Sequence, residues 1–142
     1  MLRKLEESDY DKNLIELLNF LYKDNSFTKL EFCSVFDYIN SNNNINIFVK
    51  EVDNKIVAIG TILIEQKLIH NLGTAGYIQD IIVHKDYRAR GYSREIVDYL
   101  KQVAIDNKCY KVVLNCSDDN IKMYEKMGFK LNGNEMALYS KL

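Results

Sequence analysis

Apolar positions recur at helical spacing in two stretches near the start of the chain. Each stretch follows two polar residues, three positions apart, of the kind that caps the first turn of a helix: Ser8 with Asp11, and Thr28 with Glu31. The spacing therefore predicts two amphipathic helices. Their apolar residues are Leu14, Leu17, Leu18 and Leu21 in the first, and Phe32, Val35, Phe36 and Ile39 in the second.

Shorter runs of branched apolar residues predict the strands of a sheet. Asp53-Asn54 is typical of a tight turn between two of them. A helix predicted over 93–107 joins the strand ending at Val83 to the strand beginning at Lys111, and such a crossover favours a parallel pair. The predicted strands are 2–5, 47–52, 55–64, 75–83, 111–116 and 135–139, with a further short helix over 120–127 that ends at Gly128.

The order of elements, β-α-α-β-β-β-α-β-α-β, contains no internal repeat. It predicts an α+β fold with a mixed central sheet flanked by helices. The length of 142 residues and the apolar share of 47% suit one domain over residues 1–142.

Composition narrows the possible partners. The net charge of −1 gives no reason to expect nucleic acid or an anionic membrane as a partner, and no apolar run is long enough to span a bilayer. Three cysteines without Cys-x-x-Cys spacing, and only two histidines, favour reduced thiols in a cytoplasmic protein and no metal site.

The loop Arg88-Ala-Arg-Gly-Tyr-Ser93 lies between a predicted strand and the start of a predicted helix. The free N–H groups at a helix start, together with the helix dipole, attract anions. Gly91 allows an anion to approach the backbone, and Arg88, Arg90 and Arg94 add positive charge. The loop is therefore a candidate pyrophosphate site, although a strand–helix corner with solvated arginines would have the same sequence.

The pattern Arg-x-x-Gly-x-Ser in this loop resembles the coenzyme A motif of GNAT-superfamily acetyltransferases, in which Gly or Ala is usual at the place of Ser93. Within that superfamily the chain is similar to the eukaryotic glucosamine-6-phosphate N-acetyltransferases over about residues 56–136. The similarity rests on the runs 62–70, 76–80, 109–111, 120–129 and 135–136.

The resemblance implies acetyl transfer from acetyl-CoA to the amine of glucosamine 6-phosphate, a step toward UDP-N-acetylglucosamine. It also implies a homodimer in which the segment from about Asn132 contributes to the partner. The alternatives are a GNAT enzyme that acetylates another small amine, and a non-catalytic acyl-CoA-binding domain.

The resemblance also assigns roles to residues. Tyr124 would hydrogen-bond the thioester sulfur and protonate the departing thiolate; as a plain alternative, it would be a core aromatic residue. The strand backbone would pair with the pantetheine arm, and the loop would hold the pyrophosphate. The implied cofactor residues are Ile81, Ile82, Val83, Arg88, Ala89, Arg90, Gly91, Tyr92, Ser93, Asn120 and Tyr124.

On the substrate side, Asp80 is the strand carboxylate expected to act in catalysis, and Asn115 shares that region. Relatives carry acids at the places of Gln79 and Asn115, so this chain lacks two negative charges there. Gln79 and Asp80, as neighbours in a strand, are expected on opposite faces of the sheet. The implied substrate residues are Lys67, His70, Gln79, Asp80, Lys111 and Asn115.

Overall fold

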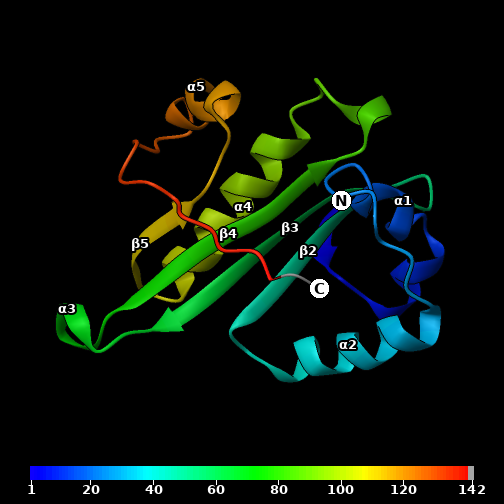
Figure 1. The fold of residues 1–142 in the computed structure, drawn as a ribbon, viewed down its shortest axis with the longest axis horizontal. Helices are drawn as coiled ribbons and strands as arrows, with labels where there is room; N and C mark the ends of the chain where they lie inside the picture. Colours follow the sequence, from blue (N-terminus) through cyan, green and yellow to red (C-terminus); the bar gives the residue numbers. More distant parts are fainter. Residues whose placement is uncertain (141–142) are drawn as a thin grey trace.

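The computed structural model describes residues 1–140 and contains a five-stranded sheet in the order β1-β2-β3-β4-β5 (Figure 1). Neighbouring strands are antiparallel except β4 and β5, which are parallel as predicted. The predicted α+β class with a mixed central sheet is confirmed. The strands are β1 Leu2–Lys4, β2 Ile45–Val52, β3 Lys55–Gln66, β4 Thr74–Val83 and β5 Cys109–Leu114.

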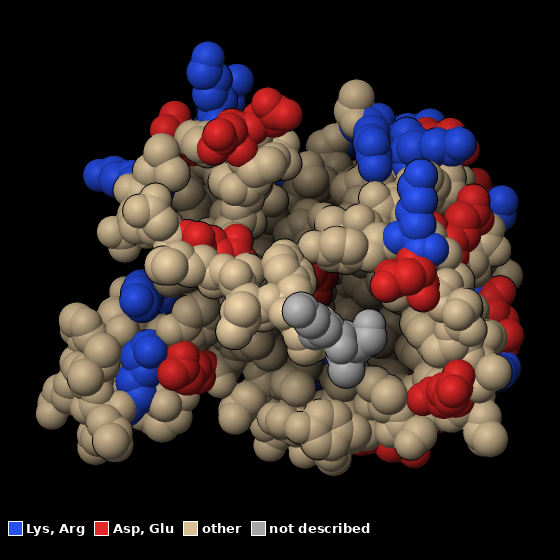
Figure 2. Space-filling view, in the orientation of Figure 1, with Lys and Arg blue, Asp and Glu red and all other residues tan. Residues whose placement is uncertain are grey.

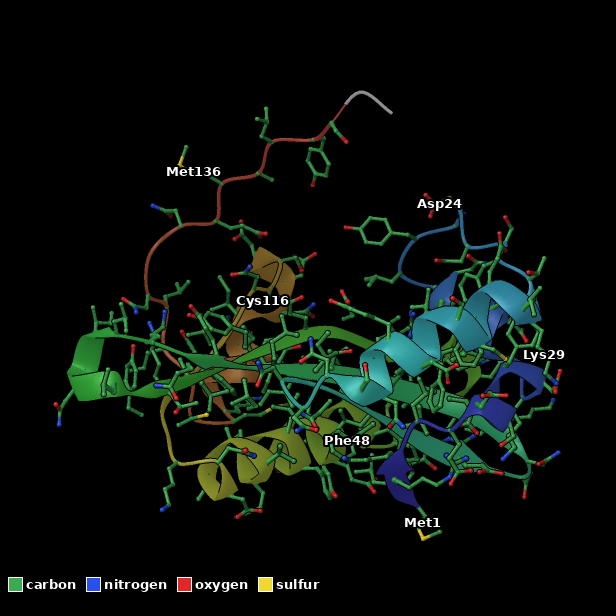
Figure 3. All side chains as sticks on the ribbon, turned by 90° about the horizontal axis from the view of Figure 1, so that it is seen from below. Met1, Asp24, Lys29, Phe48, Cys116 and Met136 are labelled. Carbon is green, nitrogen blue, oxygen red and sulfur yellow. The ribbon has the colours of Figure 1, made fainter. Side chains whose placement is uncertain are left out.

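Helices cover both faces of the sheet. α4 (Tyr92–Asp106) lies on one face, and α1 (Leu14–Leu18) and α2 (Lys29–Ser41) lie on the other (Figure 3). α3 (Ile69–Leu72) is a single turn at the tip of the β3–β4 hairpin, and α5 (Ile121–Glu125) follows β5. Three 3-10 turns are found at Glu7–Asp11, Lys85–Tyr87 and Asp118–Asn120.

The two faces of the sheet bury separate apolar clusters, because side chains alternate between the faces of a strand. The α4 cluster joins α4 and α5 to one face, and the α1–α2 cluster covers the other. Buried members of the α4 cluster include Phe48, Ile62, Ile78, Ile96, Leu100 and Tyr124. Buried members of the α1–α2 cluster are Leu14, Leu17, Phe32, Val49, Ile56, Ile59 and Ile82.

One of the two predicted helix caps is correct. Thr28 and Glu31 form a capping box at the start of α2. The box predicted at Ser8 and Asp11 is wrong: Glu6 and Asp9 form it two residues earlier, on a 3-10 turn. The Asp9 side chain is buried and accepts the Glu6 N–H at 2.8 Å, which fixes the cap there.

One leucine and one valine that the helical spacing placed on the apolar faces are exposed in the structure: Leu21 and Val35. α1 begins only after Asn13, which is left-handed (φ 62°), and it ends at Leu18. Leu21 therefore lies beyond the helix and is 44% exposed. Val35 lies on the outer side of α2 and is 56% exposed, so the apolar face of α2 is narrower than its sequence suggests.

The strand predicted over 135–139 is also wrong for the single chain. Residues 130–140 form neither helix nor strand, and the segment crosses in front of the sheet (red in Figure 1). A strand needs a neighbouring strand edge to pair with, and no described strand pairs with this segment. Its apolar side chains Met136, Leu138 and Tyr139 are 94%, 99% and 83% exposed.

A β-bulge in β4 shapes the site region. Thr61 pairs with Gln79 and Ile59 pairs with Ile82, so Gly60 stands opposite two residues, Asp80 and Ile81. Asp80 has a left-handed backbone (φ 54°), a conformation that Asp tolerates better than most residues.

The bulge resets the alternation of side chains along β4. Ile78 and Ile81, three residues apart rather than two, both pack with the α4 cluster, and Ile82 belongs to the opposite cluster. The extra residue, Asp80, is exposed instead of being buried beneath α4. Gly60 leaves room for this arrangement, since a Cβ there would lie 2.6 Å from Ile96 Cγ2 and 2.7 Å from Ile81 Cδ1.

We therefore expect Gly60→Ala to lower the free energy of unfolding by about 1–3 kcal/mol, because overpacking forces side chains and backbone to shift. Urea unfolding measures this change. Ser34→Ala, at an exposed position within α2, is the control and should change stability by less than about 0.5 kcal/mol. Equal stability of the Gly60→Ala protein and the wild type would contradict the packing described for the bulge.

Candidate active site

A cavity opens where β4 and β5 separate. Their pairing ends at Ile78 and Leu114, although β4 continues to Val83. The cavity measures about 660 Å³, and the surface is hollowed between α5 and the loop after β4 (Figure 2). Its lining residues are Leu21, Tyr22, Tyr77, Ile78, Gln79, Asp80, Ile81, Val113, Leu114, Asn115, Cys116, Ser117, Asn120, Tyr124 and Glu135.

Gln79 and Asp80 both line this cavity, and both are exposed. The left-handed bulge at Asp80 interrupts the strand alternation on which the expectation of opposite faces rested. Asn115 and Cys116 enter the cavity because β5 ends at Leu114, two residues before its predicted end. The bulge and the end of β5 thus bring four polar side chains together.

Tyr124 reaches the same cavity from α5 and is only 8% exposed. Its ring packs edge-on against Phe129, with ring centroids 6.0 Å apart. Burial, with a further contribution from Cys116, raises the pKa of Tyr124 above the ordinary value of 10.0. The phenol is therefore protonated at neutral pH and able to donate a hydrogen bond into the cavity.

The loop before α4 presents unpaired backbone N–H groups. The first N–H of the helix to find a backbone acceptor is that of Glu95, which bonds Gly91 O at 3.0 Å. Within the described chain, the N–H groups from Ala89 to Arg94 have no hydrogen-bond acceptor. Ala89 and Gly91 both have positive φ (60° and 81°), and the space beside Gly91 Cα is empty to 4 Å. The loop can therefore accommodate an anion against its backbone.

The two arginines of the loop are held by neighbouring groups. Arg88 donates from Nε to Val83 O at 3.2 Å and lies over the Phe20 ring. Arg90 donates to Asp86 O at 3.3 Å and lies 4.9 Å from the centre of the Tyr87 ring. Lys and Arg side chains gather above the end of β4 (Figure 2), so the anion site is positively charged.

The His84 ring lies between the Phe20 and Tyr87 rings that contact these two arginines. It contacts Phe20 on one side (ring centroids 4.7 Å apart) and Tyr87 on the other (5.6 Å). Nδ1 accepts the Asp86 N–H at 3.2 Å, so the neutral ring carries its proton on Nε2, which lies 3.3 Å from Glu16 Oε1. This arrangement fixes the loop relative to α1.

Three predicted substrate residues lie away from the cavity, near the tip of the β3–β4 hairpin. Lys67 pairs with Glu65 at 3.3 Å, and hydrogen bonds to Tyr77 and Glu65 raise its pKa although burial opposes them. His70 stacks on Tyr110 with ring centroids 4.1 Å apart, and the Lys111 ammonium lies over the same ring. None of the three lines the cavity of its own chain, and their role in substrate binding stays a prediction.

Nine of the fifteen lining residues were not among the predicted site residues. Six of them lie beside predicted ones, on or just after β4 and β5: Tyr77, Ile78, Val113, Leu114, Cys116 and Ser117. The other three come from other segments. Leu21 and Tyr22 come from the segment after α1, and Glu135 comes from the segment after α5. Tyr22 and Leu21 carry no motif that would have revealed them. Glu135 was part of the family resemblance at 135–136, but without an assigned role.

Two further features of the described residues bear on function. Residues 1–140 contain no group of three or more His, Cys, Asp or Glu side chains placed to hold a metal ion. None of the helices in that range has both the length and the apolar character needed to cross a membrane.

The site combines a candidate anion-binding loop with a splayed pair of parallel strands. The sequence matches the acetyltransferase (GNAT) family over residues 10–129. The chain therefore belongs to the GNAT acetyltransferase family.

Named relatives within the family are similar over nearly the full chain. Glucosamine 6-phosphate N-acetyltransferase 1 of Dictyostelium discoideum is 36% identical over 140 residues, with 96% of this chain and 88% of the relative covered. The Candida albicans glucosamine 6-phosphate N-acetyltransferase is 36% identical, with 95% and 92% covered. The crystal structure of the Arabidopsis thaliana enzyme of that name superposes with a TM-score of 0.93 at 37% identity, covering 98% of this chain and 97% of that one.

Proposed function

We propose that this chain transfers the acetyl group of acetyl-CoA to the amine of glucosamine 6-phosphate, a step toward UDP-N-acetylglucosamine. The observation that carries the proposal is the placement of Tyr124, a protonated phenol, at the point where β4 and β5 separate. The names of relatives at 36–37% identity support this choice of substrate.

The residues present fit a coenzyme A molecule. The unpaired N–H groups of Ala89 to Arg94, with Arg88 and Arg90, suit the pyrophosphate. Beyond Ile78, β4 has no partner on its β5 side, so the backbone of Ile81–Val83 can add the pantetheine arm as if it were a strand. The Val83 carbonyl already accepts a hydrogen bond from Arg88 Nε. Pairing with pantetheine therefore depends on the backbone of Ile81 and Ile82. Asn120 lines the cavity, whereas Tyr92 and Ser93 begin α4 and the centre of the Tyr92 ring lies 4.6 Å from Lys50 Nζ of β2.

Bound acetyl-CoA supplies a thioester carbonyl that an amine can attack. Tyr124 donates its phenolic proton to the sulfur as the C–S bond breaks and the C–N bond forms. The attacking amine must be neutral, and it releases one proton as the amide forms, to Asp80 or to water, while Tyr124 regains one. Asp80 and Asn115 orient the amine beside Tyr124 from the ends of β4 and β5.

The substrate phosphate requires cations that the cavity lining does not supply. No Lys, Arg or His lines the cavity among the described residues, and a phosphate needs at least one fixed cation. We assign this role to Lys67, His70 and Lys111 acting across a homodimer, which would bring the hairpin tip of one chain to the cavity of its partner. The same dimer would cover the exposed Met136 and Leu138.

A thiol-release assay with acetyl-CoA tests the proposed function. The panel is glucosamine 6-phosphate, glucosamine, glucose 6-phosphate and a lysine peptide. We expect rapid release only with glucosamine 6-phosphate. Equal or faster release with another amine would identify a GNAT enzyme of different substrate choice, and no release with any amine would favour an acyl-CoA-binding domain.

Gly91→Val should weaken acetyl-CoA binding at least tenfold, about 1.4 kcal/mol or more. The valine side chain would occupy the open space in which the phosphate approaches, and φ of 81° would strain it. Calorimetry measures the affinity. Gly133→Val, with a similar φ of 84° and open surroundings away from the loop, is the matched control. An unchanged affinity in folded Gly91→Val protein would remove the phosphate site from this loop.

Tyr124→Phe should lower kcat roughly 10- to 1000-fold with acetyl-CoA affinity near that of the wild type, because the hydroxyl acts as charge develops on sulfur. Since burial raises the pKa of Tyr124, its ionisation should reduce wild-type kcat only above the ordinary range of tyrosine. Single-turnover kinetics measure the chemical step. Full single-turnover activity in the variant would leave Tyr124 as a packing residue.

Light scattering at micromolar concentration should give twice the single-chain mass of 16.6 kDa. Replacing the exposed apolar pair, Met136→Asp with Leu138→Asp, should shift the protein toward the single-chain mass, because charge opposes burial of this segment. A wild-type mass of 16.6 kDa would contradict the dimer.

We also place the protein in the cytoplasm, on the basis of its free cysteines Cys33, Cys109 and Cys116.

A further inference from the structure

The charge of the cavity comes from two carboxylates. Among its lining residues, Asp80 from β4 and Glu135 from the segment after α5 are the only acids, and no lining residue is basic. Neither acid forms an ion pair within residues 1–140. Two uncompensated carboxylates in one cavity favour a cationic ligand group.

The path of the chain brings Glu135 to this place. Gly128 and Gly133 both have left-handed backbones (φ 96° and 84°), and they turn the chain from α5 across the front of β4 (Figure 1). Met136 points away from the body of the molecule (Figure 3) and is 94% exposed. Its neighbour Glu135 lines the cavity and is itself exposed, so the segment brings an acidic residue to the site while Met136 faces outward.

The rest of the lining gives Glu135 a chemical role. Gln79 and Asn115 are neutral amides, so on the strands that form the cavity Asp80 is the single negative charge. An amino sugar in water is partly protonated, and its ammonium gains from a carboxylate within hydrogen-bond reach. Glu135, from the segment after α5, adds the second carboxylate of the lining.

We propose that Glu135 is a substrate-binding residue that, with Asp80, recognises the ammonium group of the amino sugar. This inference rests on the proposed function and adds the residue that distinguishes an amino sugar from its hydroxyl counterpart. Gln79 on β4 is neutral, so the second negative charge of the site comes from Glu135 in the segment after α5.

The test compares the binding of glucosamine 6-phosphate with that of glucose 6-phosphate, which has a hydroxyl in place of the amine. In Glu135→Gln we expect about tenfold weaker binding of glucosamine 6-phosphate and unchanged binding of glucose 6-phosphate. KM for glucosamine 6-phosphate should rise by a similar factor, while KM for acetyl-CoA stays unchanged. Glu125→Gln, an exposed acid on α5 outside the cavity, is the matched control and should leave both values unchanged.

A charge exchange makes the test independent of folding defects. Adding Gln79→Glu to Glu135→Gln restores the second carboxylate from β4, and we expect it to recover most of the lost preference for the amino sugar. An unchanged preference in Glu135→Gln would overturn the inference, as would equal weakening of both sugars or no recovery in the double variant. If the wild type instead fails to acetylate glucosamine 6-phosphate, the proposed function fails first, and that result is visible before any variant is made.

Discussion

The placement of Gly60 opposite two residues of β4 is the constraint on which the site depends. A residue with a Cβ at this position would collide with Ile96 and Ile81, so the bulge and the glycine require each other. Because of the bulge, Ile81 keeps its place beneath α4 while Asp80 stays out of the apolar core. The pairing of β4 with β5 ends just before it, at Ile78. The end of β5 at Leu114 thus opens the cavity, and the bulge places Asp80 in its lining.

The anion site depends on the same strand in a different way. β4 ends at Val83, whose carbonyl accepts from Arg88, and the chain then turns through His84 and Tyr87 into α4. The Phe20 and Tyr87 rings limit the motion of Arg88 and Arg90. The backbone N–H groups from Ala89 to Arg94 stay unpaired within the described chain. A site that is formed before its ligand arrives loses less entropy on binding. The cavity borders β4 and the loop follows the end of this strand, so a long ligand such as coenzyme A can contact both.

Much of this organisation could be predicted from local sequence. The strand over 75–83, the loop at 88–93 and the helix after it depend on neighbouring residues, and their patterns gave nearly correct bounds. The bulge could not be predicted, because it depends on the register between Gly60 and Asp80. Glu135 was missed for a similar reason, since only the course of the chain after α5 brings it to the cavity. The first helix cap was misplaced because burial of Asp9 outweighed the local signal at Ser8.

The central claim is that coenzyme A lies along the end of β4 and over the loop before α4. Hydrogen exchange of backbone amides, followed with and without bound coenzyme A, measures this directly. We predict slower exchange in the ligand complex for Ile81–Val83 and for Ala89–Arg94, with no change in α2, which lies outside the cavity lining and the loop. Protection confined to other segments, with unchanged exchange from Ala89 to Arg94, would contradict it.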